Sequence, residues 1–396
     1  MASSRPACAV TSLTEFIHRV YRPAGGLRHR RILDFRPARD FAARHLTPSA
    51  NFFEPTFNDC RYCQLPAKHQ PLDILVPYGH STDRPWDQDA HMLAAKGWAV
   101  EHIVPVKDSW ADREPSAPVD PDPGWAEAAR LGVLGSCGSE GGPTASHVVF
   151  DPCPPLARHI TDIEMALQGP SLTDATSRTV LDLGCGSGRD LAWLCSRSLR
   201  ELATGQGRSS VVWKGLGLDS VRGALRRTRL LADQLGVGSH VVVGHGKFHS
   251  DGLFYLKSDL ADPVLGNPPP SIITGGPPLF TTSDRRTRDT PSIDPPRDLS
   301  FQFDLVLGVR FLNRGLFTTG QISQWIAPGG FLLYSTFVDL PEFPDEHPHG
   351  FLHRLGPGEL AGWFGPGTGY EVLDDRVECI EDGRHVVSFL ARKNLG

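Results

Sequence analysis

Long apolar runs and any marked excess of charge are both missing from this sequence. No stretch approaches the roughly 18 apolar residues of a membrane-spanning helix, so we expect no transmembrane segment and no membrane partner. The first twenty residues mix polar and charged side chains through their apolar ones, which argues against a secretory signal. Lys and Arg number 40 against 45 Asp and Glu. This balance argues against a protein that mainly coats nucleic acid or an anionic surface.

What the 396 residues do contain is ordinary for a globular chain. Hydrophobic residues make up 40 %, and the length predicts two or three folding units. The 41 Gly and 34 Pro predict long irregular segments as well. Eight scattered cysteines indicate reduced intracellular thiols and a cytoplasmic protein. The Arg-rich start also has some features of a mitochondrial presequence, but it carries apolar residues at helical spacing, as a folded domain would: Leu13, Phe16, Ile17 and Val20.

The chain is predicted to be of the α/β class and to divide into three blocks. Residues 1–106 alternate short strands and helices, which predicts a small parallel sheet. Residues 107–146 are rich in Pro, Asp, Gly and Ser and are interpreted as a linker with one short helix. Residues 147–396 repeat the alternation on a larger scale, interrupted by a Pro-rich insertion at 263–300.

The most informative motif lies at residues 179–188, Thr-Val-Leu-Asp-Leu-Gly-Cys-Gly-Ser-Gly. An apolar strand with Asp182 near its end runs into Gly184, Gly186 and Gly188, and a helix follows. Glycines permit positive φ angles and let a ligand approach the backbone. A turn between a parallel strand and a helix N-terminus is a common place for a nucleotide-like ligand.

Later strands end in acidic residues in the same way. Residues 211–219 end in Asp219, whose carboxylate could accept two hydrogen bonds from a ribose diol. A third strand is expected at 252–260, with Asp259 near its end, and a fourth at 303–309. A fifth is expected at 326–334, introduced by Pro-Gly-Gly.

This series of motifs resembles that of class I S-adenosylmethionine-dependent methyltransferases. The resemblance implies a Rossmann-like, seven-stranded domain that binds S-adenosyl-L-methionine. Asp182 and the glycine turn would then hold the methionine end of the cofactor, Asp219 the ribose and Asp259 the adenine. The cofactor-binding residues expected in this way are Asp182, Gly184, Cys185, Gly186, Ser187, Gly188, Asp219, Ser220, Asp259, Leu260 and Gly308.

Further phrases resemble the tellurite-resistance-type methyltransferases. They are Arg189-Asp190 and the segments 309–317, 333–337 and 355–364. This resemblance implies methylation of a small, soft or anionic acceptor. Arg310 and Arg314 are the expected catalytic residues, because a guanidinium can orient an anion.

The first block resembles the opening of a rhodanese-like domain. The residues concerned are Leu33-Asp-Phe-Arg-Pro37 and the segment from Phe41 to Asn51. In active members of that family a nucleophilic Cys follows the next core strand, but here Gly79 stands at that position. We therefore expect a catalytically silent domain, with a structural or substrate-presenting role.

Two other functions stay open at this point. The protein could methylate a protein or RNA, or it could be a non-enzymatic binding protein built from two degenerate domains. The charge balance argues against nucleic acid, so a small-molecule acceptor is favoured, and the oligomeric state is left open. No metal site is expected, because Cys60-x-x-Cys63 lacks a second Cys pair.

Overall fold

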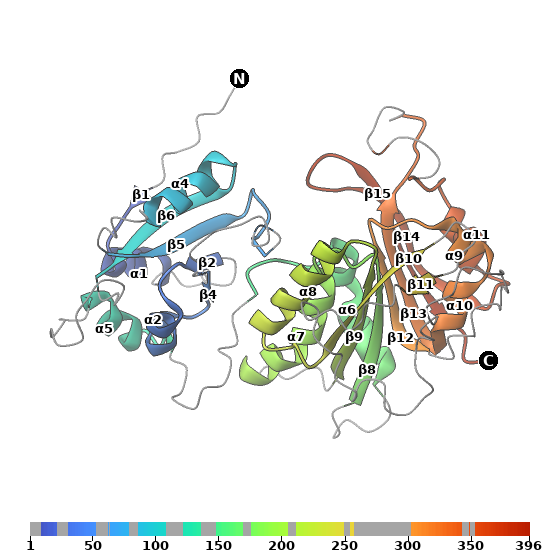
Figure 1. The fold of residues 1–396 in the computed structure, drawn as a ribbon, viewed down its shortest axis with the longest axis horizontal. Coiled ribbons are helices and arrows are strands. Elements are labelled where there is room, and N and C mark those ends of the chain that lie inside the picture. Colours follow the sequence, from blue (N-terminus) through green and yellow to red (C-terminus); the bar gives the residue numbers. More distant parts are fainter. Residues whose placement is uncertain are drawn as a thin grey trace, which may run out of the picture. The chain divides into compact units, whose positions relative to one another are not determined.

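The computed structural model divides into two compact units, Met1–Asp151 and Pro152–Gly396, which are described separately (Figure 1). Among the residues that the structure describes, no helix is long and apolar enough to cross a membrane. Asp259, Leu260, the 263–300 segment and the loop containing Gly79 lie outside the described residues. The described residues are 9–21, 31–52, 62, 64–78, 86–107, 122–135, 148–168, 176–204, 211–248, 254–256, 302–342, 348 and 353–396.

Unit 1 is built on a five-stranded parallel sheet in the order β1-β6-β5-β2-β4. Its strands are β1 (Ala9–Val10), β2 (Arg31–Asp34), β4 (Ala50–Asn51), β5 (Pro71–Pro77) and β6 (Ala99–Val106). A separate pair joins β3 (His45–Leu46) to β7 (Leu134–Gly135). The helices are α1 (Leu13–Tyr21), α2 (Ala38–Ala43), α4 (Trp86–Ala95) and α5 (Pro123–Arg130).

The short helix predicted within 107–146 is present as α5, but α5 and β7 belong to unit 1 and not to a linker outside it. Trp125 and Ala128 of α5 are buried in one core cluster with Phe16 of α1. Asp122 caps the helix by accepting a hydrogen bond from the Gly124 N–H at 3.0 Å. The Pro, Asp and Gly that suggested a linker therefore start a helix, whose apolar face completes the core of unit 1.

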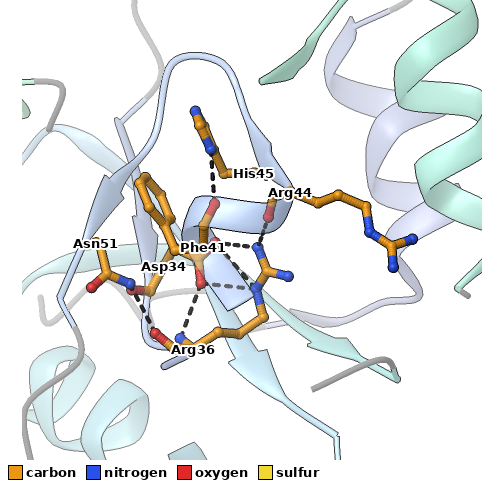
Figure 2. Close-up of polar contacts among 6 residues, drawn as sticks. All are labelled: Asp34, Arg36, Phe41, Arg44, His45 and Asn51. Carbon is orange, nitrogen blue, oxygen red and sulfur yellow. Dashed lines mark hydrogen bonds and ion pairs between the residues drawn. The ribbon is translucent and has the colours of Figure 1, made fainter. Parts of the chain in front are cut away.

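A buried polar cluster fixes the end of β2 (Figure 2). Asp34 and Arg36 form an ion pair at 2.7 Å, and their side chains are 0 % and 1 % exposed. The Arg36 guanidinium also donates to the Arg44 carbonyl at 2.6 Å, while the Asn51 amide donates to the Asp34 and Arg36 carbonyls. These residues hold β2, α2 and β4 together, so the Asp-x-Arg phrase has a structural role here.

Unit 2 contains an eight-stranded sheet in the order β11-β10-β9-β8-β12-β13-β15-β14. The five strands from β10 to β13 in that order are parallel, whereas β15 is antiparallel to both of its neighbours. The strands are β8 (Thr176–Leu183), β9 (Val211–Asp219), β10 (Val241–Phe248), β11 (Phe254–Leu256), β12 (Phe303–Val309), β13 (Ile326–Phe337), β14 (Tyr370–Cys379) and β15 (His385–Lys393).

Helices cover both faces of this sheet (Figure 1). One face is covered by α6 (Pro154–Leu167), α7 (Arg189–Thr204) and α8 (Arg222–Gln234). Buried Glu164 of α6 accepts hydrogen bonds from Arg197 of α7 and from the Trp213 indole of β9, and so connects these elements. The opposite face packs against α9 (Arg314–Thr318), α10 (Gln321–Trp325) and α11 (Glu359–Phe364).

The strand predicted at 252–260 is present at Phe254–Leu256, but it is not the third parallel strand of the sheet. The third parallel strand is β10, in which Val241 to His245 pair with Gly215 to Asp219. Phe254–Leu256 instead forms β11, a short strand that lies antiparallel to β10 at the edge. The described sheet therefore has eight strands where seven were predicted. The run Val241-Val-Val243 is the β-branched signal that indicates β10.

This topology has a switch point at the carboxyl ends of β8 and β12. From β8 the chain passes outward to β9 and β10, and then returns to place β12 on the other side of β8. Open α/β sheets bind ligands where the winding reverses in this way. The residues that follow β8, β9 and β12 are therefore the ones that define the candidate site.

A charged cluster ties α6 to the edge strand β14. The Asp374 carboxylate lies 2.7 Å from His159 Nε2 and 3.2 Å from Arg158 Nη1, and it also accepts from Arg376 at 2.6 Å. Burial raises the pKa of Asp374, but the hydrogen bonds from Arg376 and His159 outweigh that effect and hold the pKa below its ordinary value. The ionised carboxylate thus stabilises the folded state.

We expect Asp374→Asn to lower the free energy of unfolding in a pH-dependent way. A depressed folded-state pKa contributes stability above the ordinary Asp value of about 4, and this contribution is lost as the pH falls through the folded-state pKa. The cost should be about 1–3 kcal/mol at pH 7 and clearly less at pH 3. Urea unfolding followed by circular dichroism at both pH values measures it.

Asp375→Asn is the matched control for this prediction. Burial and the neighbouring Asp374 raise the pKa of Asp375, so removing this charge should leave stability at pH 7 unchanged or slightly higher. A cost of Asp374→Asn that is the same at both pH values would contradict the assignment.

Candidate functional site

A glycine-rich turn connects β8 to α7 at the carboxyl edge of the sheet. Gly184, Gly186 and Gly188 have φ values of 65°, 58° and 70°, all in the left-handed region. Within the turn, the Cys185 N–H donates to the Leu218 carbonyl at 3.0 Å, and the Gly188 N–H donates to the Cys185 carbonyl at 2.8 Å. Because only glycine adopts this conformation at low cost, the three glycines are what allow such a tight turn.

The three glycines have different surroundings. A Cβ atom at Gly184 would lie 2.6 Å from the Phe311 ring, and one at Gly188 would collide with the Thr228 side chain. At Gly186 the nearest atom would be a backbone oxygen 3.9 Å away, so this position is open. Gly184 and Gly188 are thus required by packing. Gly186 presents bare backbone to unfilled space, where a ligand could approach.

Asp219, at the end of β9, is brought directly to this turn. Its Oδ2 accepts a hydrogen bond from the Gly186 N–H at 2.9 Å, and its Oδ1 accepts one from the Val221 N–H at 2.8 Å. A carboxylate has about four lone-pair sites, so each oxygen retains acceptor capacity. Asp219 therefore both fixes the turn and can accept from a ligand hydroxyl.

Two further carboxylates lie close to Asp219. Burial raises the pKa of Asp182 well above its ordinary value, and the nearby charges of Asp190 and Asp219 raise it further. Burial also raises the pKa of Asp190, although this residue accepts a hydrogen bond from the Cys153 N–H at 2.6 Å. Asp190 and Asp219 thus oppose the ionisation of Asp182, and a positively charged ligand at the turn would favour it.

The remaining residues predicted around the turn differ in what they expose. The Cys185 side chain is buried against β9, and burial followed by the charges of Asp182 and Asp219 raises the pKa of its thiol. Only its backbone faces the turn. Ser187 is partly exposed and Ser220 is exposed, and the Ser220 carbonyl oxygen lies 3.2 Å from His245 Nε2.

Gly308 lies on β12 between β8 and β13. It pairs with Leu183 on one side and with Tyr334 on the other, and a Cβ atom would collide with the Tyr334 ring. Tyr334 is buried and donates from its hydroxyl to the Phe311 carbonyl at 2.6 Å. Gly308 is thus required by the packing of Tyr334, while its contact with a cofactor stays a prediction.

Arg310 follows β12 and has an unusual backbone. Its φ of 54° makes it the one non-glycine residue with positive φ in the described part of the chain, and its N–H donates to the Ser335 carbonyl at 2.7 Å. Such strain costs about 1–3 kcal/mol and is concentrated at functional sites. The Arg310 side chain is exposed and forms no ion pair with any described residue. Its charge opposes the rise in the pKa of Asp190, and it adds to the effect of the hydrogen bond from Arg384 in lowering the pKa of Asp382.

Arg314 lies in a different environment from Arg310. Its guanidinium forms an ion pair with Glu359, with Nε 2.6 Å from Oε1, and donates to the Arg354 carbonyl. Burial raises the pKa of Glu359, but the hydrogen bond from Arg314 outweighs it and the pKa lies below its ordinary value. These contacts connect α9 to α11, so Arg314 supports the fold around the site and does not present a cation to it.

Two residues near the site were not predicted from the sequence. His245 on β10 is the register partner of Asp219 and is 5 % exposed. Asp382 lies in the β14–β15 hairpin, whose tip is at the carboxyl edge because β15 begins beside the end of β13. A correct assignment of β10 would have identified His245. Asp382 could not be found, because only strand order brings the hairpin to this edge.

No protein-family model matches the chain. It is 29 % identical over 365 residues to the uncharacterized protein UNK4.09 of Schizosaccharomyces pombe, covering 91 % of this chain and 93 % of that one. The structure of this chain is also similar to that of TehB from Haemophilus influenzae, with 14 % identity and a TM-score of 0.33. The similarity covers 55 % of this chain and 58 % of TehB. A methyltransferase from Thiobacillus denitrificans, solved with S-adenosyl-L-homocysteine, gives 17 % identity and a TM-score of 0.30, covering 57 % and 67 %.

The different surroundings of the glycines predict different costs of substitution. Gly186→Ala adds left-handed strain only, about 1–2 kcal/mol. Gly188→Ala adds the same strain and a collision with Thr228, so it should cost about 2–5 kcal/mol. Thermal and urea unfolding of the two variants measure the difference. Equal stabilities would contradict the assignment of open space at Gly186.

Proposed function

We propose that this chain is an S-adenosyl-L-methionine-dependent methyltransferase whose acceptor is a small anionic or soft nucleophile. The observation that carries the proposal is the open backbone at Gly186, next to Asp219 and two further carboxylates at the carboxyl edge of the sheet. This arrangement combines room for a ligand, a hydrogen-bond acceptor for a hydroxyl and carboxylates whose ionisation a cationic ligand would favour.

The residues of this site fit S-adenosyl-L-methionine by charge. The cofactor carries a sulfonium and an ammonium group, and both are positive. The charges of Asp190 and Asp219 add to the cost of ionising Asp182, and a cationic ligand would offset that repulsion. Asp182 and the turn would hold the methionine end, and the remaining lone pairs of Asp219 would accept from the ribose hydroxyls.

The chain's own residues then have mainly a positioning task. When bound, S-adenosyl-L-methionine supplies a methyl group activated by attachment to a positive sulfur. A thiolate or oxyanion acceptor already carries its negative charge, so no strong general base is required from the protein. Holding the acceptor and the cofactor in line can supply most of the rate enhancement.

Arg310 is the residue that we assign to the acceptor. It is exposed, it forms no ion pair with a described residue, and its strained backbone is held by the bond to Ser335. Its guanidinium matches an anionic acceptor, with which it can form a bidentate contact. Arg314 supports this region indirectly through Glu359.

For unit 1 we propose a structural or substrate-presenting role without sulfur transfer. The absence of a Cys at position 79 supports this, because the nucleophile of a rhodanese reaction would have to stand there.

The test uses radiolabelled S-adenosyl-L-methionine with paired acceptors of different charge. Tellurite is an oxyanion, and mercaptoacetate carries a carboxylate charge whether or not its thiol is ionised. 2-Mercaptoethanol carries no charge other than that of its ionised thiol. Arg310→Ala should lower kcat/KM for the anionic acceptors by at least about tenfold, as expected for a charge-assisted contact. It should leave 2-mercaptoethanol and the affinity for S-adenosyl-L-homocysteine nearly unchanged.

Arg39→Ala, on the exposed surface of unit 1, is the matched control and should behave like the unaltered protein. Loss of cofactor affinity together with activity in Arg310→Ala would place Arg310 in the cofactor site. If none of the three acceptors is methylated, the proposal of a small-molecule acceptor is contradicted.

A further inference from the structure

Three side chains with metal-ligating atoms converge in unit 1, whereas the site described above belongs to unit 2. They are Asp73 of β5 and Glu101 and His102 of β6, and one ligand atom from each lies within 4.8 Å of the others. The two strands are neighbours in the parallel sheet (Figure 1). The cluster lies near the amino ends of these strands, whereas the loop containing Gly79 follows the carboxyl end of β5.

A β-bulge brings the two adjacent residues of β6 to the same side. The pairing passes from Leu72 opposite Val100 to Asp73 opposite His102, so Glu101 is the extra residue. The burial pattern agrees, since Val100 and Ile103 both pack in one core cluster although they are three residues apart. A regular strand would direct Glu101 and His102 to opposite faces. A bulge redirects a side chain in this way, often at functional sites.

The donor atoms are held at distances that suit a common ion. His102 Nδ1 lies 2.8 Å from Asp73 Oδ1, and the His102 ring packs edge-on against Phe16 with centroids 5.6 Å apart. Ligands about 2.0–2.2 Å from one zinc ion lie about 3–3.5 Å from each other in tetrahedral geometry. The three ligand atoms lie within 4.8 Å of one another, so the set would have to close slightly around an ion.

The charges of the cluster also favour a cation. The Asp73 side chain is 0 % exposed, and a buried carboxylate requires a compensating charge. Its negative charge is also felt by Tyr21, whose pKa is raised first by burial and then by Asp73. Glu101 adds a second carboxylate to the cluster, and a bound divalent ion would carry the charge opposite to that of the two carboxylates.

We propose that Asp73, Glu101 and His102 form a binding site for a divalent transition-metal ion, with zinc as the best match. An imidazole nitrogen with two carboxylate oxygens is a donor set that zinc accepts, whereas calcium and magnesium favour oxygen alone. Three protein ligands leave a coordination position for water. The ion would join β5 to β6 at the bulge.

The experiment titrates ZnCl₂ into the metal-stripped full-length protein by calorimetry, and CoCl₂ with detection of its visible absorption bands. We expect about one ion per chain and a rise in the unfolding temperature. Glu101→Gln and His102→Gln should each weaken zinc binding at least tenfold. Glu101 is exposed, so its variant should remain folded by circular dichroism.

Two substitutions outside the cluster serve as matched controls. His91→Gln on α4 and Glu371→Gln on β14 are exposed and remove the same ligand types. They should leave zinc affinity within twofold. Zinc that binds equally to Glu101→Gln and to the controls would overturn the proposal, as would an unaltered protein that binds no zinc or cobalt. In that case the Asp73–His102 contact is an ordinary ion pair, and the methyltransferase proposal is unaffected.

Discussion

The site of unit 2 depends on one hydrogen-bonded contact, that between the Gly186 N–H and the Asp219 carboxylate. It connects the turn after β8 to the end of β9, and so fixes the two neighbouring strand ends on which a ligand would rest. The left-handed conformation of three glycines allows the turn to reach Asp219, and the open side of Gly186 leaves room beside it. Gly184 packs against Phe311 and Gly188 packs against Thr228, and these contacts also support the turn.

Much of this arrangement could be predicted from local sequence. An apolar strand followed by alternating glycines specifies a tight turn into a helix, and Asp219 ends the next apolar strand. Parallel strands place their carboxyl ends on the same edge, so the turn and Asp219 had to meet once the parallel α/β class was predicted correctly. The strand at 303–309 was also predicted from its apolar residues. The structure buries most of them, as is typical of a strand covered on both faces.

What could not be predicted depends on contacts between distant segments. A strand that includes residues 254–256 was predicted, but its antiparallel pairing with β10 could not be predicted from its own residues. Arg314 is close to Arg310 in the sequence, but only the fold gives it Glu359 as a partner. The short helix within 107–146 was predicted, but its place in the core was not, because that depends on the packing of Trp125 in one cluster with residues of α1. The bulge at Glu101 arises from the register between β5 and β6. No sequence motif therefore indicates that Asp73, Glu101 and His102 lie together.

The most direct test of this account is calorimetric titration of S-adenosyl-L-homocysteine into the unaltered protein and into Asp219→Ala and Asp219→Asn. We predict binding with a dissociation constant on the order of 1–100 µM, about 5–8 kcal/mol. Asp219→Ala should abolish it while circular dichroism shows a folded protein, and Asp219→Asn, which keeps one acceptor oxygen, should retain weaker binding. No binding by the folded, unaltered protein, or equal binding by Asp219→Ala, would contradict the assignment of this site.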